Sequence, residues 1–109
     1  MKNNHSFRVG DVIVNSWGWE QTNIDFFQVV GVTKASVKIR EIAGDYTPSE
    51  NAFLAGTTVP KIDEFTSDEV KTKRVGSYHI GGDEIDTIRF PYGTGRKWNG
   101  KPQYESHYA

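Results

Sequence analysis

The sequence predicts an all-β fold (or a β-rich α+β fold), built as a small, strongly bent antiparallel sheet or open barrel with at most one short helix. Three observations predict it. Short runs rich in Val, Ile and Phe recur along the chain and are separated by turn-forming residues. Apolar and polar residues alternate within these runs, which is the period of a strand. No stretch keeps the 3.6-residue apolar period of a long amphipathic helix.

The N-terminal third contains two predicted strands, which follow residues 1–6, a segment that we expect to be disordered. We expect the first strand over residues 9–15 and the second over residues 24–33. The second strand carries apolar residues on both of its faces. We therefore expect it to lie centrally in the sheet and to be covered on both sides for part of its length.

The middle of the chain begins with a tight turn at Lys34-Ala35, which leads into a third strand of alternating apolar and polar residues. Residues 43–59 are rich in Gly, Pro, Ser, Asn and Asp, so we expect a long loop there. Residues 60–65 are expected to be extended. The segment Thr66-Ser67-Asp68-Glu69 fits a helix N-terminal capping box, and any short helix would begin at this point.

The last third returns to predicted strands separated by turns. Gly81-Gly82-Asp83 is a predicted turn, and Asn99-Gly100 is typical of a type I′ hairpin because both residues tolerate a positive φ. The predicted strands are residues 73–80, 85–90 and 96–98, with the last of these paired to residues 101–108. The whole chain, residues 1–109, is interpreted as a single β-rich domain.

Composition excludes several classes of function. The formal net charge is −1 over 109 residues, which argues against a general nucleic-acid binder but leaves room for a local basic patch. The chain has no cysteine, and hence no disulfide, no thiolate zinc site and no cysteine nucleophile. No run of apolar residues approaches the length of a membrane span or a signal peptide. We expect a cytoplasmic protein that does not bind a membrane and is a monomer or a homodimer.

The segment between the first two strands is the main candidate site. Two tryptophans flank a glycine, and four polar side chains follow. Tryptophan offers a large rigid surface and an N–H donor, so the segment is interpreted as a surface that recognises a partner. The predicted partner-binding residues are Trp17, Trp19, Glu20, Gln21, Thr22 and Asn23. The structural alternative is that one tryptophan closes the end of the barrel while the polar side chains cap the loop.

A second cluster near the C-terminus interleaves cations with aromatic rings, as single-stranded nucleic-acid grooves do. The residues of this alternative nucleic-acid-binding site are Arg89, Tyr92, Arg96, Lys97, Trp98 and Lys101. The structural alternative is a solvated hairpin whose aromatic rings face the core. The segment Tyr92-Gly93-Thr94-Gly95-Arg96-Lys97 lacks the full spacing of a phosphate-binding loop, and no helix is predicted after it.

Catalytic and metal-binding signatures are not found in the sequence. The three histidines have no ligand neighbour at metal-binding spacing, and no serine-nucleophile motif is present. We therefore expect no metal, no cofactor and no enzymatic activity. An acid–base site would have to be assembled in three dimensions, and Asp25 on the central strand is the carboxylate to inspect first.

Four blocks resemble a group of small uncharacterised proteins of bacteriophages and conjugative elements. They are residues 9–14, the block Ser16-Trp17-Gly18-Trp19-Glu20-Gln21-Thr22-Asn23, residues 25–30, and Trp98-Asn99-Gly100-Lys101-Pro102 with Tyr104. The resemblance covers about the first 40 residues and the last 12, whereas the middle differs. It implies a genomic context and no particular reaction.

That context favours a protein that binds a host protein and inhibits a host defence system, in the manner of anti-CRISPR proteins. The expected location is then the cytoplasm of the host bacterium. A nucleic-acid-binding accessory protein is the alternative, and an enzyme acting on a nucleotide or nucleic acid is a third hypothesis.

Overall fold

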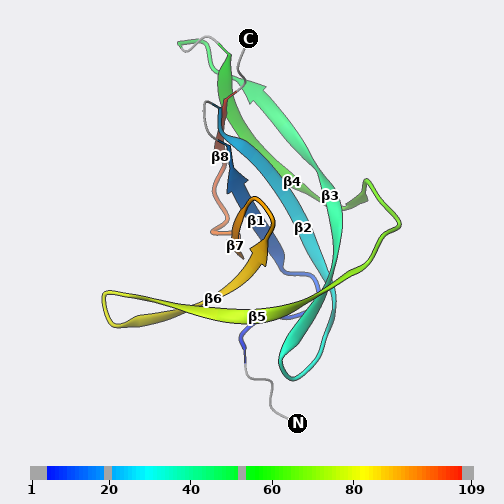
Figure 1. Cartoon of the computed structure of the whole chain (residues 1–109). Helices are drawn as coiled ribbons and strands as arrows, with labels where there is room; N and C mark the ends of the chain where they lie inside the picture. Colours follow the sequence, from blue (N-terminus) through cyan, green and yellow to red (C-terminus); the bar gives the residue numbers. More distant parts are fainter. Residues whose placement is uncertain (1–4, 19–20, 52–53, 107–109) are drawn as a thin grey trace.

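The computed structural model describes residues 5–18, 21–51 and 54–106, and the regular structure in these residues consists entirely of β-strands (Figure 1). In chain order the strands are β1 (Val12–Trp17), β2 (Asn23–Val32), β3 (Ser36–Pro48), β4 (Ala55–Phe65), β5 (Lys71–Ile80), β6 (Asp83–Phe90), β7 (Gly93–Lys97) and β8 (Gln103–Ser106). The predicted all-β fold is confirmed. Within the described ranges, no helix is long and apolar enough to cross a membrane.

Six of the strands close into a ring by antiparallel pairing. The pairs around the ring are β1–β2, β2–β3, β3–β5, β5–β6, β6–β7 and β7–β1. The β7–β1 pair closes the ring over only three residues of β1, from Ile13 to Asn15. β4 and β8 lie outside the ring, because β4 pairs with the C-terminal half of β3 and β8 pairs with β4 (Figure 1).

The strand β2 lies between two apolar clusters, as its two-sided sequence predicts. Phe27 and Val29 point into the ring, where the core cluster also contains Ile13, Val37, Ile39, Ile88, Phe90 and, from the N-terminal segment, Phe7. Phe26 points to the other face, where it packs with Val12 and Ile42 beneath β4 and the C-terminal segment. The prediction of a strand covered on both faces is confirmed.

The N-terminal segment differs in detail from the prediction. The first strand begins at Val12 instead of Val9, because residues 8–11 form a turn in which the Asp11 amide donates to the Arg8 carbonyl at 3.0 Å. Gly10 permits this turn with a φ of +98°. Of the residues expected to be disordered, 1–4 lie outside the described ranges, whereas the amide and hydroxyl of Ser6 both donate to the Asp86 carboxylate.

The prediction of a long loop over residues 43–59 is wrong. β3 continues to Pro48 and β4 begins at Ala55, so most of this segment is paired. Its turn-forming residues are compatible with strands because the two backbones come close together: a Cβ on Gly56 would lie 2.2 Å from the Thr47 carbonyl oxygen. The β3–β4 ladder also has a register shift between Ile42 and Gly44, and this shift accommodates Gly44, the other glycine of the segment.

The helix suggested by the capping box is not present. Residues 66–70 form an irregular connection between β4 and β5, in which the Ser67 hydroxyl accepts from the Glu69 amide at 3.0 Å. The Thr66 hydroxyl donates to the Glu41 carboxylate at 3.0 Å instead of capping a helix. A capping box needs an apolar face behind it to make a helix stable, and this segment lacks one.

The predicted C-terminal hairpin is also wrong in its pairing. β8 pairs with β4, not with residues 96–98. Asn99-Gly100 does form a turn: Gly100 has a φ of +81°, and the Lys101 amide donates to Asn99 Oδ1 at 2.9 Å. The strand that follows is diverted because the Trp98 indole donates to the Lys101 carbonyl at 2.7 Å and its ring packs on the cluster around Phe26.

Closure of the ring predicts a strong requirement for Gly95. A Cβ at this position would lie 2.6 Å from Phe90 Cε2 and 2.7 Å from Ile13 Cγ2, inside the core. We expect Gly95→Ala to lower the free energy of unfolding by about 1–3 kcal/mol, measured by urea denaturation.

Gly76→Ala is the matched control, because its Cβ would lie 3.4 Å from Thr87 Oγ1, an ordinary contact on a strand of the same ring. We expect the control to change stability by less than about 1 kcal/mol. Equal effects of the two substitutions would contradict the close approach of β7 to β1.

Candidate binding site

At one end of the ring, the inward faces of three neighbouring strands change from apolar to polar. The last buried apolar residues on these faces are Ile13 of β1, Phe27 of β2 and Ile39 of β3. Two positions from each of these residues toward this end of the ring, on the same face, stand Asn15, Asp25 and Glu41. Strand register sets Asn15 directly beside Asp25, whereas Glu41 stands one step deeper in the ring, opposite Phe27.

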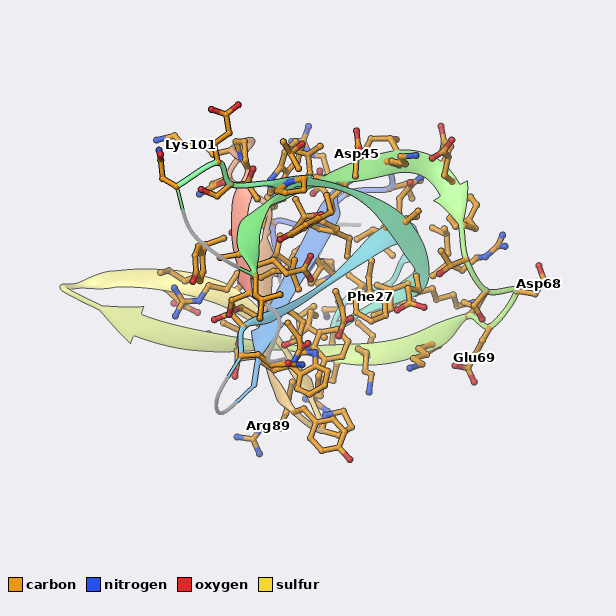
Figure 2. All side chains as sticks on the ribbon, turned by 90° about the horizontal axis from the view of Figure 1, so that it is seen from above. Phe27, Asp45, Asp68, Glu69, Arg89 and Lys101 are labelled. Carbon is orange, nitrogen blue, oxygen red and sulfur yellow. The ribbon has the colours of Figure 1, made fainter. Side chains whose placement is uncertain are left out.

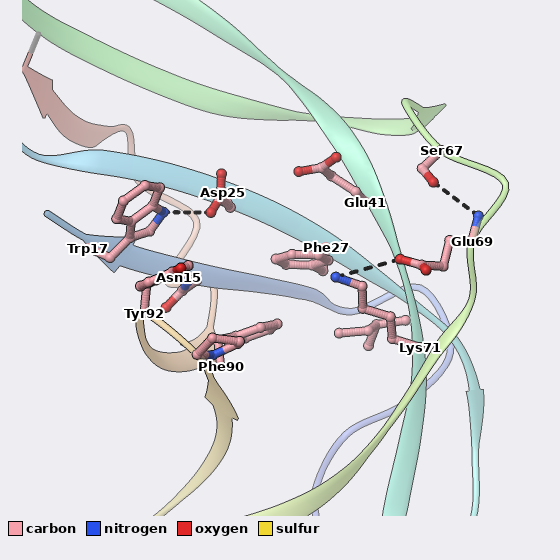
Figure 3. A pocket seen from close by; sticks show the side chains of 12 residues that line it. Asn15, Trp17, Asp25, Phe27, Glu41, Ser67, Glu69, Lys71, Phe90 and Tyr92 are labelled. Atoms are coloured by element: carbon pink, nitrogen blue, oxygen red, sulfur yellow. Dashed lines mark hydrogen bonds and ion pairs between the residues drawn. The ribbon is translucent and has the colours of Figure 1, made fainter.

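An open pocket of about 260 Å³ lies at this end of the ring (Figure 3). We call it the mouth pocket. Besides the three polar residues, it is lined by Trp17, Phe27, Ile39, Ser67, Glu69, Lys71, Phe90, Pro91 and Tyr92. The connection between β4 and β5 thus supplies one wall, and the tip of the β6–β7 hairpin supplies the opposite one.

Two pairs of aromatic rings form the apolar surface of the mouth pocket. The rings of Phe27 and Phe90 stack at the centre, with centroids 4.8 Å apart and planes at 19°. At the rim, the rings of Trp17 and Tyr92 meet at 5.5 Å and 31°. The Trp17 indole N–H donates to Asp25 Oδ2 at 2.6 Å, which holds the half-buried indole in one orientation (Figure 3).

The charged lining of the mouth pocket is predominantly negative. It contains the three carboxylates of Asp25, Glu41 and Glu69 and the single ammonium of Lys71, which leaves a formal charge of −2. Lys71 Nζ lies 3.7 Å from Glu69 Oε1 and 5.8 Å from the centre of the Phe27 ring. A second ammonium, that of Lys73, lies 5.6 Å from the Phe90 ring behind the pocket.

Asn15 is the most deeply buried polar residue of the mouth pocket, with an exposed fraction of 3%. Its Oδ1 atom has no hydrogen-bond partner among the residues that the structure describes. A buried acceptor without a partner destabilises a folded protein by about 1–3 kcal/mol. The Oδ1 atom lies beside Gly93 of β7, where a Cβ would come within 2.5 Å of it. An apolar side chain would therefore fill this position on the inward face more stably.

The structure places only part of the predicted partner-binding loop at this site. Trp17 lines the mouth pocket, whereas Trp19 and Glu20 lie outside the described residues. Gln21 Nε2 donates to Asn23 Oδ1 at 2.9 Å, and the amide of Thr22 donates to a side chain of β8. These bonds tie the loop to itself and to the C-terminal strand, and neither is the bond from a polar side chain to the loop's own backbone that the structural alternative predicts.

The second predicted set, the interleaved cations and aromatic rings, is divided by the fold. Arg96, Lys97 and Trp98 line one groove of about 580 Å³ on the outside of β1 and β7. Arg89 and Lys101 do not line it and lie on opposite sides of the molecule (Figure 2). Tyr92, with 71% of its surface exposed, belongs instead to the rim of the mouth pocket.

Within that groove, two of the candidate side chains already have partners. The Lys97 ammonium lies 3.4 Å from Asp11 Oδ2 and donates to the Ser6 carbonyl at 3.1 Å. The Trp98 indole N–H is bonded to the Lys101 carbonyl. The guanidinium of Arg96 is the exposed cation that the groove presents most openly.

Sequence reasoning identified Asp25 and Trp17 but missed most of the mouth pocket. Asn15 could have been found, because strand alternation places it on the inward face two residues after Ile13. No local signal places Glu69 and Lys71 beside the ends of β2 and β3. Among the described residues, no group of three or more His, Asp or Glu side chains is arranged to hold a metal ion.

Comparison of the chain with protein-family models, with curated proteins and with solved structures found no match. The interpretation of the site therefore depends on its own geometry.

The unpaired Asn15 oxygen leads to a stability prediction. We expect Asn15→Leu, which keeps a similar shape and removes the buried acceptor, to raise the free energy of unfolding by about 1 kcal/mol. Urea denaturation measures the change. A loss of stability would contradict this account, because it would mean that the Asn15 carboxamide is satisfied within the fold.

Proposed function

We propose that this protein binds another protein through the mouth pocket and the adjoining β1–β2 loop. The observation that carries the proposal is a rigid, concave aromatic surface with carboxylates at the end of a closed ring of strands. Aromatic side chains held in fixed orientations contribute most of the binding energy in many protein interfaces. Trp17 has this character, because Asp25 fixes its indole and Tyr92 packs against it.

The size of the mouth pocket favours a protein partner over a free cofactor. Its volume of about 260 Å³ lies below the roughly 300–1,000 Å³ of sites that enclose whole small molecules. A pocket of this size suits one inserted side chain, with the rest of the contact made on the surface around it. Tyr92 and the half-buried Trp17 at the rim belong to such a surface.

We further propose that the partner is a host protein and that binding inhibits a host defence system. The support for this step is the resemblance of the blocks around Trp17 and Trp98 to small proteins of bacteriophages and conjugative elements. Small phage proteins without catalytic signatures often act by occupying a surface of a host protein, and a β-scaffold with an aromatic site is suited to that role.

Partner capture from host lysate tests the proposal. We expect the wild-type chain to retain a specific protein, and Trp17→Ala to weaken its binding by about 1–4 kcal/mol, measured by calorimetry with the purified partner. The loss follows from removal of the indole that the rim presents.

Tyr104→Ala is the matched control, because Tyr104 is an aromatic residue of β8, 59% exposed, and does not line the mouth pocket. It should leave binding unchanged. The proposal is wrong if no lysate yields a partner, or if both variants bind as the wild type does.

A second candidate function is nucleic-acid binding through the groove on β1 and β7. The observation that favours it is the lining, in which Arg96 and Lys97 stand with Trp98 and no carboxylate. An anionic backbone would suit such a groove, although the net charge of −1 provides no general attraction.

A gel-shift titration with single-stranded DNA tests this candidate. Arg96→Gln should weaken binding and lower the slope of log affinity against log salt by about one. Arg89→Gln is the matched control, since Arg89 is an exposed arginine outside the groove. Absence of binding at low salt, or affinity that does not change with salt, excludes this candidate.

A further inference from the structure

We infer that the mouth pocket accepts the guanidinium group of an arginine side chain presented by the partner protein. The inference rests on the proposed function, because it names the chemistry by which the same site recognises its partner. Three properties of the pocket carry it: its charge, the faces of its aromatic rings, and the unpaired acceptor of Asn15.

The first property is the excess of carboxylates. Asp25 uses one oxygen to accept from the Trp17 indole, and Glu41 uses one to accept from the Thr66 hydroxyl. Among the described residues, neither the second oxygen of Asp25 nor that of Glu41 has a hydrogen bond or ion pair. Both side chains belong to the inward faces of neighbouring strands, so a cation in the pocket would meet two carboxylates at once.

The second property is the presence of aromatic faces that already hold a cation. The Lys71 ammonium lies 5.8 Å from the centre of the Phe27 ring, within the range of a cation–π interaction. This position shows that the wall of the pocket is compatible with positive charge. It also makes Lys71 a competitor, because its charge opposes the entry of a second cation.

The third property is that the neutral Asn15 lines the pocket beside the carboxylates, with its Oδ1 buried next to Gly93 and without a hydrogen-bond partner among the described residues. An anionic ligand would be repelled by the neighbouring carboxylates, and a neutral ligand would leave their charge uncompensated. A guanidinium has five N–H donors in a planar array, so it can serve several acceptors together.

Arginine fits these properties better than lysine does. The guanidinium is planar and weakly hydrated, stacks on aromatic faces, and bonds carboxylates in a fixed geometry, whereas an ammonium is a compact and strongly hydrated charge. The pocket combines flat aromatic faces from Phe27, Phe90 and Trp17 with acceptors from two strands. This combination matches a planar group with donors around its edge.

The test uses the isotope-labelled full chain and two small probes, N-acetyl-arginine amide and N-acetyl-citrulline amide. The citrulline probe has the shape of arginine without its charge. We expect the arginine probe to shift amide NMR signals of mouth-pocket residues in a saturable manner, and the citrulline probe to bind much more weakly.

Two isosteric or near-isosteric variants of the pocket give opposite expectations. Glu41→Gln removes a negative charge and should weaken the arginine probe by about two- to fivefold, whereas Lys71→Gln removes the competing ammonium and should strengthen it by a similar factor. Arg74→Gln on the same strand as Lys71 does not line the pocket and should change nothing. The NMR spectrum of each variant reports whether it is folded.

The inference is overturned if the arginine probe shifts no signal of the pocket or if the citrulline probe binds equally well. It is also overturned if Glu41→Gln strengthens binding of the arginine probe and Lys71→Gln weakens it. Its failure can be told apart from failure of the proposed function. A captured partner that binds Glu41→Gln and Lys71→Gln as it binds the wild type would refute the arginine inference alone. Binding of the arginine probe in a protein that captures no partner would refute the protein-binding function alone.

Discussion

Closure of the sheet through the short β1–β7 pairing is the constraint on which the rest of the structure depends. It brings Gly95 against Ile13 and Phe90, and it gives the sheet an inside that alternate residues of six strands must fill. The core rings of Phe27 and Phe90 stack across this interior. Because the inward faces of β1, β2 and β3 all turn polar toward the same end, the closed ring ends there in a pocket instead of an apolar plug.

Much of this arrangement could be predicted where the signal lies in neighbouring residues. The sequence of β2 alternates two apolar faces, and the structure buries Phe26 and Phe27 in two different clusters. The same alternation places Asp25 on the inward face, which is why a carboxylate on the central strand deserved inspection. Trp17 is predicted as a site residue because an indole offers a large rigid surface and an N–H donor.

The remaining features depend on contacts between distant segments, and local patterns could not supply them. Glycine is typical of turns, yet Gly56 lies in strand β4. A glycine is needed at this position because the backbone of β3 leaves no room for a side chain. The Asn99-Gly100 turn is predicted by its residues, but β8 pairs with β4, a strand far from it in the sequence, while Trp98 packs on the cluster around Phe26. Glu69 and Lys71 reach the pocket only because β5 pairs with β3 to complete the ring.

In the mouth pocket, the Trp17 indole is held in place by its hydrogen bond to Asp25. The side-chain oxygen of Asn15 has no hydrogen-bond partner among the described residues. A crystal structure of the protein bound to its captured partner tests this account most directly. We expect an arginine of the partner to enter the mouth pocket, with its guanidinium between the carboxylates of Asp25 and Glu41 and against the aromatic rings. A partner that docks elsewhere and leaves the mouth pocket open to solvent would contradict the account.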